Sequence, residues 1–163
     1  MKELIIMRHA KSDWGSTMKP DFDRTLNKQG KTDAQAMGIE IHRRDAVPDI
    51  IISSPAKRAR KTAKLVAEHC KYTSEIFYES DFYYGEPQDY INRVLLVDNH
   101  FERVLVIGHN PIIELLLRIL LGLDTNLMDV PTASVFCLEF EIENWRDLKI
   151  GQGQMKWMTR PAV

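Results

Sequence analysis

The sequence predicts an α/β fold, a three-layer α/β/α sandwich around a mainly parallel sheet with an antiparallel edge at the C-terminal side. Short β-rich apolar runs alternate with longer segments of helical periodicity as far as residue 122, as expected for βα units. The remaining chain contains two alternating segments, 134–142 and 154–159, which indicate antiparallel strands. At 163 residues the chain is long enough for one domain, 1–163, and too short for two ordinary ones.

The first βα unit begins the chain. Its strand is expected at residues 4–7, and a polar loop at 11–26 follows it. Asn27 is the predicted N-cap of a helix that runs to about residue 44. Apolar side chains recur on one face of this helix, at Ala34, Met37 and Ile41 among others, which is typical of an amphipathic helix that packs on a sheet.

Two later strands are followed by a short polar residue and then a proline. Ser54-Pro55 follows one strand and Asn110-Pro111 follows the other. Because Ser and Asn cap helices and proline fits the first helical turn, we expect a helix to begin at each of these pairs. The expected segments are strands at 50–52, 75–78 and 104–107, helices ending near residues 70 and 121, a helix at 87–99, and a short turn at 144–148.

Composition and charge restrict the partners that we expect. A net charge of −1 and a pI near 6.5 do not favour general electrostatic binding of nucleic acid or anionic lipid. The longest apolar run, 112–123, is interrupted by Glu114 and Arg118 and is too short to cross a membrane. No signal peptide is recognised, so we expect a cytoplasmic protein. Cys70 and Cys137 lack metal-like spacing and are expected to be reduced thiols.

Basic and imidazole side chains follow three of the predicted strands. Arg8 and His9 end the first, Arg58 lies shortly after the second, and His109 follows the fourth. Ligands of open α/β sheets bind beyond the carboxyl ends of the parallel strands, so we expect these side chains to share one pocket. Guanidinium forks and the N–H groups of helix starts suit a phosphoryl group. The glycine-rich nucleotide-binding motifs G-x-x-x-x-G-K-[ST] and G-x-G-x-x-G do not occur.

Around these residues the sequence resembles the histidine phosphatase superfamily, also called phosphoglycerate mutase-like. The resemblance is greatest to the SixA-type phosphohistidine phosphatases and extends over nearly the whole chain. One departure is Ala10, where most of the superfamily has glycine and SixA-like members also have alanine. The matching segments are Met7-Arg8-His9-Ala10, Ser53-Ser54-Pro55-Ala56-Lys57-Arg58-Ala59-Arg60-Lys61-Thr62-Ala63 and Gly108-His109-Asn110-Pro111.

The resemblance implies a phosphoglycerate mutase-like fold and a covalent phosphoryl-transfer mechanism. His9 is the expected nucleophile, forming a phosphohistidine intermediate. Arg8, Arg58 and His109 are expected to surround the transferring group and offset its charge, and Arg24 is a further candidate substrate-binding residue. These cationic side chains would replace a metal ion, so neither a metal site nor a cofactor is expected.

The leaving group separates the candidate substrates. Phosphoester-cleaving relatives supply a general acid after the third strand, where this chain has Glu79, Asp81 and Glu86 outside the sequence context of the mutase branch. Whether one of these carboxylates acts as an acid is left open by the sequence. A protonated phosphohistidine leaves as neutral imidazole and needs such an acid less.

We therefore expect a phosphohistidine phosphatase that acts on a phosphotransfer or signalling protein, with inorganic phosphate or other oxyanions able to occupy the pocket. The length of the chain agrees with this expectation, because 163 residues leave no room for the lid domain with which larger relatives enclose a metabolite. Two alternatives remain open at this stage. One is a small-molecule phosphomonoesterase of the same superfamily, and the other is a non-catalytic phosphate-binding module.

Overall fold

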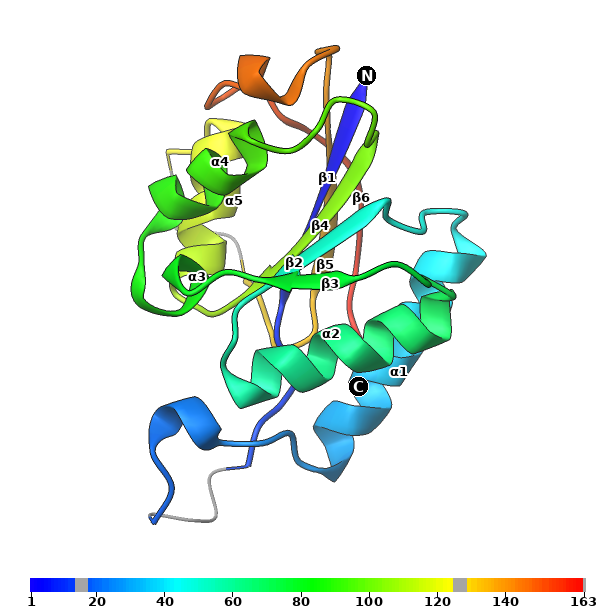
Figure 1. Cartoon of the computed structure of the whole chain (residues 1–163), viewed down its shortest axis with the longest axis vertical. Coiled ribbons are helices and arrows are strands. Elements are labelled where there is room, and N and C mark those ends of the chain that lie inside the picture. The colour runs from blue at the N-terminus through cyan, green and yellow to red at the C-terminus, as the bar shows by residue number, and fades with distance from the viewer. Residues whose placement is uncertain (14–17, 125–128, 163) are drawn as a thin grey trace.

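The computed structural model describes residues 1–13, 18–124 and 129–162 (Figure 1). Within these residues a six-stranded sheet has the order β3-β2-β4-β1-β5-β6. β1 pairs in parallel with β4, and β2 pairs in parallel with both β3 and β4, whereas β5 is antiparallel to β1 and β6. The predicted mainly parallel sheet with an antiparallel C-terminal edge is confirmed. Its strands are β1 (Lys2–Arg8), β2 (Ile50–Ser53), β3 (Ile76–Tyr78), β4 (Arg103–Gly108), β5 (Val135–Phe140) and β6 (Gln154–Thr159).

Helices cover both faces of the sheet, which confirms the three-layer arrangement (Figure 1). On one face lie α1 (Lys28–Arg43) and α2 (Lys57–Cys70); the other carries α3 (Asp81–Tyr84), α4 (Pro87–Leu95), α5 (Ile112–Leu121) and the 3-10 helix η2 (Trp145–Asp147). Successive side chains of a strand point to opposite faces. In β1, Ile5 and Met7 therefore pack toward α1 and α2, while Leu4 and Ile6 pack toward α4 and α5.

The start of α1 fixes the loop that follows β1. The Asn27 side chain accepts a hydrogen bond from the Gly30 amide at 2.8 Å, as predicted for an N-cap. Gly30 also lies against the loop, because a Cβ atom there would be 2.0 Å from the Lys11 carbonyl oxygen. The Asn27 amide donates to that same carbonyl at 3.0 Å. The loop is thus anchored to α1, and its 3-10 helix η1 (Asp21–Asp23) is packed against α2.

The N-cap positions of α2 and α5 differ from the predicted Ser54 and Asn110 by two residues and one residue, respectively. The α2 helix begins after Ala56, and the Ser54 hydroxyl accepts from the Ala56 amide at 3.2 Å and contacts His109 instead. The α5 helix begins after Pro111, and the Asn110 side chain accepts from the Glu114 amide at 3.2 Å within the first turn. A tertiary contact with His109 has thus taken up the Ser54 hydroxyl, whereas the Asn110 side chain still accepts from an amide at the start of α5.

Other boundaries differ by a few residues. The predicted helix at 87–99 ends at Leu95, and the four residues of α3 lie where no helix was expected, because so short a segment shows no helical period. Cys70 and Cys137 are buried free thiols, as expected. Among the described residues, no helix is long and apolar enough to cross a membrane.

Candidate active site

The carboxyl ends of β1, β2 and β4 meet at one cavity of about 520 Å³. The β1–β4 register places Arg8 beside Gly108, so the residues that follow these two strands are neighbours. The His9 amide donates to the Gly108 carbonyl at 2.9 Å, and the His9 and His109 ring centroids are 5.0 Å apart. All five residues predicted from the sequence line the cavity, which is formed by Arg8, His9, Lys11, Ser12, Asp21, Arg24, Arg58, His109, Asn110 and Thr132.

His9 has a defined tautomer. Its Nδ1 lies 2.7 Å from the Ala10 carbonyl oxygen, which can only accept, so Nδ1 carries the proton. The other ring nitrogen, Nε2, is then unprotonated, and its lone pair accepts a long hydrogen bond from Arg58 Nε at 3.4 Å. Burial and the neighbouring His109 hold the pKa of His9 well below its usual value. His9 is therefore a neutral imidazole with Nε2 available as a nucleophile.

His109 is also neutral in the free protein. Burial, followed by the charge of Arg58, lowers its pKa to about 3. Its Nε2 lies 2.7 Å from the Ser54 hydroxyl, which already accepts from the Ala56 amide, so we assign the hydroxyl proton to this contact. Nδ1 is then an N–H donor. His109 is therefore not one of the cationic residues with which we grouped it from the sequence, because the burial of its ring keeps it neutral.

Three arginines with different anchors face the cavity. Arg58, in the first turn of α2, donates from Nη1 to the Asp21 carbonyl at 2.8 Å and from Nη2 to Asp21 Oδ2 at 3.1 Å. Arg8 donates from Nη1 to the Val130 carbonyl at 2.9 Å. Arg24 donates from Nη1 to the Ser12 hydroxyl at 2.9 Å and from Nε to Asp21 Oδ1 at 3.0 Å. Fixed guanidinium groups of this kind suit the oxygens of a phosphoryl group.

Asp21 is the residue that the sequence analysis missed. Its carboxylate joins Arg24 and Arg58 and accepts a hydrogen bond from the Tyr83 hydroxyl at 2.6 Å. The hydrogen bond from Tyr83 and the charge of Arg58 lower the pKa of Asp21 to about 2, against a smaller opposing effect of burial. The i,i+3 spacing of Asp21 and Arg24 was the available signal, but it gave no indication that Arg58 and Tyr83 would join them.

The three carboxylates left open by the sequence do not line this cavity. Glu79 pairs with Arg93 at 3.5 Å. Glu86 takes part in a reciprocal capping box with Asp89 at the start of α4. Asp81 is exposed in the first turn of α3. Asp21 is the carboxylate that does line it, and it is ionised.

Tyr90 supports the end of β4. Its hydroxyl donates to the Phe82 carbonyl at 2.7 Å and fills the space in front of Gly108, where a Cβ atom would be 1.9 Å from the hydroxyl oxygen. Glycine is therefore required immediately before His109. Through this contact α4 links the strand end that carries His109 to α3, which carries Tyr83.

The donor set fits a tetrahedral oxyanion. Arg8 Nε and His109 Nδ1 are buried and have no hydrogen-bond partner within the described part of the chain. A buried donor without a partner is costly, and an anion bound in the cavity could satisfy both atoms. The same residues contain no cluster of three or more His, Cys, Asp or Glu side chains that could hold a metal ion.

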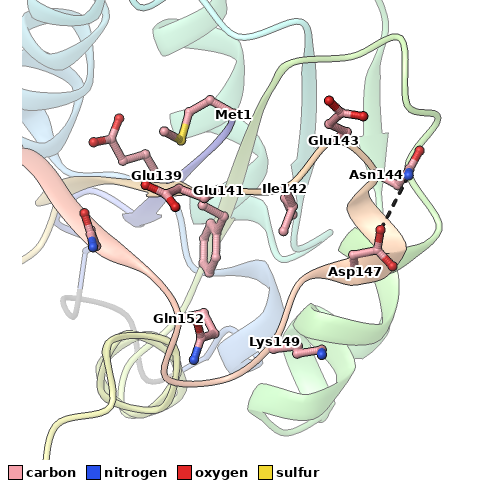
Figure 2. Close-up of a pocket in the computed structure, with 11 residues that line it drawn as sticks. Met1, Glu139, Glu141, Ile142, Glu143, Asn144, Asp147, Lys149 and Gln152 are labelled. Carbon is pink, nitrogen blue, oxygen red and sulfur yellow. Dashed lines mark hydrogen bonds between the residues drawn. The ribbon is translucent and has the colours of Figure 1, made fainter.

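A second cavity of about 520 Å³ lies at the opposite end of the sheet, near the start of β1 and the end of β5 (Figure 2). Its charged lining is mainly acidic and contains neither histidine nor arginine. With four carboxylates against one ammonium group, its charge opposes the binding of an anion. The charged side chains are Glu139, Glu141, Glu143, Asp147 and Lys149, and the apolar ones include Phe140 and Ile142.

Comparison with known proteins identifies the family. The profile of the histidine phosphatase superfamily (branch 1) matches residues 4–82, which carry Arg8, His9, Asp21, Arg24 and Arg58. Over this segment the chain matches the histidine phosphatase superfamily. The second imidazole, His109, lies outside the matched segment, and the fold brings it to the same cavity.

Solved structures of this superfamily share the fold, which is phosphoglycerate mutase-like. SixA of Agrobacterium tumefaciens superposes with a TM-score of 0.84 at 24% sequence identity, covering 98% of this chain and 98% of that one. The protein histidine phosphatase SixA complexed with tungstate gives a TM-score of 0.82 at 20% identity, covering 97% and 96%.

The curated relatives match over shorter segments. Phosphoserine phosphatase 1 of Hydrogenobacter thermophilus is 37% identical over 70 residues, which are 42% of this chain and 32% of that protein. The matched segments span about a third of the length of the curated relatives, from 29% to 36%.

Proposed function

We propose that the protein is a phosphohistidine phosphatase that acts through a covalent intermediate on His9. The observation that carries this proposal is the neutral, buried His9 ring, whose Nε2 lone pair faces Arg58 in a cavity lined by cationic groups. A histidine nucleophile must keep the attacking nitrogen unprotonated while its ring is held in one orientation. The Ala10 carbonyl supplies that orientation.

In the first half-reaction, His9 Nε2 attacks phosphorus and the P–N bond of the substrate breaks. The bonding electrons return to the substrate ring nitrogen, and the phosphoryl group is left on His9. The His9 ring becomes an imidazolium whose Nδ1–H remains donated to the Ala10 carbonyl. Arg8, Arg58 and the N–H of His109 stabilise the oxygens of the transferring group.

In the second half-reaction, water attacks the phosphorus of phosphorylated His9. The P–Nε2 bond breaks, its electrons return to Nε2, and His9 regains its neutral form. Inorganic phosphate leaves with the oxygen of the water, either with both of its protons as H2PO4⁻ or with one as HPO4²⁻, the other proton passing to solvent. The guanidinium groups supply the positive charge that a metal ion provides in many phosphoryl-transfer enzymes, so we propose a metal-independent reaction.

A phosphohistidine substrate is favoured by the state of the carboxylates. An alkoxide leaving group needs a proton from a general acid, but Asp21 is ionised and Glu79, Asp81 and Glu86 lie outside the cavity lining. A protonated phosphohistidine departs as neutral imidazole without that acid. The structural similarity to SixA, described in one case as a protein histidine phosphatase complexed with tungstate, supports the same substrate and the binding of oxyanions.

The second candidate is a small-molecule phosphomonoesterase, which is favoured by the local similarity to phosphoserine phosphatase 1. One experiment separates the two. Phosphate release from a phosphohistidine-bearing phosphotransfer domain is compared with release from phosphoserine and other small esters, with wild type and His9→Ala side by side. We expect preference for the protein substrate and, after rapid alkaline quench, acid-labile phosphate on His9.

Each other outcome has a definite meaning. Preference for a small ester would move the assignment to a phosphomonoesterase. No turnover of either substrate, with phosphate still bound, would indicate a non-catalytic phosphate-binding module. Undiminished turnover by His9→Ala would remove His9 from the mechanism.

A further inference from the structure

The proposed mechanism uses the arginines of the cavity but leaves the Asp21 carboxylate without a role. Asp21 lies at the mouth: its side chain is 52% exposed, whereas the side chains of Arg58 and Arg24 are 7% and 11% exposed. Three donors hold it in place, from Arg24, Arg58 and Tyr83. An anionic group beside the site of a phosphate dianion opposes substrate binding unless it contributes something else.

Arg58 forms hydrogen bonds with both the Asp21 carboxylate and the proposed nucleophile, His9. Its Nε lies 3.4 Å from His9 Nε2, and its Nη2 lies 3.1 Å from Asp21 Oδ2. The Arg58 guanidinium thus lies between the two groups, with His9 on its buried side and the Asp21 carboxylate on its solvent side. In an in-line displacement the leaving group departs opposite the nucleophile. His9 is buried and Asp21 is exposed at the mouth, so a leaving group that departs toward solvent would pass Asp21.

We propose that Asp21 determines leaving-group specificity by pairing with the imidazolium ring of phosphohistidine. This inference rests on the proposed function and names the group that recognises the substrate. The ring nitrogen not bonded to phosphorus carries a proton and donates it in a hydrogen bond to Asp21. When the P–N bond breaks, its electrons return to the other ring nitrogen, and the ring leaves as neutral imidazole with that proton still attached. Asp21 stays ionised throughout.

The surroundings of Asp21 keep it suited to this role. Its lowered pKa, about 2, leaves it charged at every pH at which the enzyme would work. Burial and the hydrogen bond to Asp21 raise the pKa of Tyr83 to about 12, so Tyr83 remains a donor. The Tyr83 ring packs edge-on against His109 at 5.4 Å and against Phe22 at 5.1 Å. Asp21 is therefore held by both the η1 loop and α3.

The test compares two substrates that share a phosphoryl group and differ in leaving-group charge, N-phosphoimidazole and p-nitrophenyl phosphate. For Asp21→Asn we expect kcat/KM for N-phosphoimidazole to fall by about tenfold or more, since a charge pair is lost. We expect kcat/KM for p-nitrophenyl phosphate to stay level or rise, so the ratio of the two falls by at least about tenfold. Asp23→Asn, on the same 3-10 helix and exposed, is the matched control and should leave both values unchanged.

An equal loss on both substrates would overturn the proposal, because it would mean that Asp21 only positions Arg58 and Arg24. Asp21→Glu keeps the charge and should retain most of the wild-type ratio. If Asp21→Asn does not fold, Asp21→Ser allows the same comparison with a smaller neutral side chain. Failure of the proposed function looks different: wild type itself would then release no phosphate from N-phosphoimidazole or from a phosphohistidine-bearing domain.

Discussion

The two ends of the sheet carry cavities of equal volume and opposite charge. Each measures about 520 Å³. The cavity at the carboxyl ends of β1, β2 and β4 contains the paired imidazoles and three arginines, whereas the cavity near the start of β1 contains four carboxylates and one lysine (Figure 2). Size therefore says nothing about which cavity binds a phosphoryl group. The charge of the side chains that line each cavity determines which of the two suits a phosphoryl group.

The two cavities also differ in how the chain builds them. Apart from Met1, the acidic cavity is formed by residues 139–154, the region around the β5–β6 connection. The basic cavity draws on residues from 8 to 132, which meet because parallel strands place their carboxyl ends at one edge of the sheet. A site assembled from distant segments is rigidly held by the sheet, and this gives its groups the fixed geometry that catalysis requires.

The largest effect should come from Arg58, the residue that contacts both His9 and Asp21. Arg58→Ala is expected to lower kcat/KM for a phosphohistidine substrate by about 10²–10³-fold, because a preorganised charge next to the transferring phosphoryl group is lost. Steady-state kinetics with thermal unfolding as a folding control measures this. A loss below about threefold would mean that the basic cavity is not where transfer occurs.

Acid should lower the free energy of unfolding of the protein, because the buried imidazole of His109 is neutral in the folded state. The pKa of His109 falls from 6.5 to about 3 on folding, because of burial and Arg58. Its contribution to stability is present above pH 6.5 and is lost as the pH falls toward 3, since the unfolded chain binds the proton first. Between pH 7 and pH 4 the His109 ring should lower the free energy of unfolding of the wild type by on the order of 3 kcal/mol. This part of the decrease should be absent from His109→Asn. Denaturant unfolding at both pH values measures it, and parallel losses in wild type and variant would contradict the expectation.

Ser54 should have a smaller effect, acting through His109. Ser54→Ala removes the hydroxyl that fixes Nε2 of His109, so the ring is free to change tautomer. We expect about a tenfold fall in kcat with little change in KM, since the oriented N–H is needed most in the transition state. Ser53→Ala is the matched control, because the Ser53 hydroxyl donates to the Ser54 carbonyl and not to His109. Equal kcat values for the two variants would show that Ser54 does not position His109.

The smallest effect is expected at the acidic cavity. Glu143→Gln and Asp147→Asn together should leave kcat/KM within about twofold of wild type, because electrostatic effects across the sheet are screened by salt. If this double variant impaired turnover as strongly as a substitution at the basic cavity, it would contradict the hypothesis that only the basic cavity takes part in catalysis.

Much of the site could be predicted from the sequence. The apolar runs that become β1, β2 and β4 are short and well bounded, and parallel strands share a carboxyl edge, so the pattern alone places Arg8, His9, Arg58 and His109 together. Asn27 was also identified, because capping is a local interaction between residues three apart. The same reasoning did not find the N-cap of α2, because the Ser54 hydroxyl contacts His109, which is 55 residues away.

The sequence by itself thus determined the succession of βα units, the antiparallel C-terminal strands and the chemical identity of the groups at the cavity. The tertiary structure decided the states of those groups. The neutral form of His109 depends on its burial, and the position of Asp21 depends on Arg58 and Tyr83, which are 37 and 62 residues away. Pattern and spacing report local geometry, whereas pKa values and long-range hydrogen bonds depend on which distant segments the fold brings into contact.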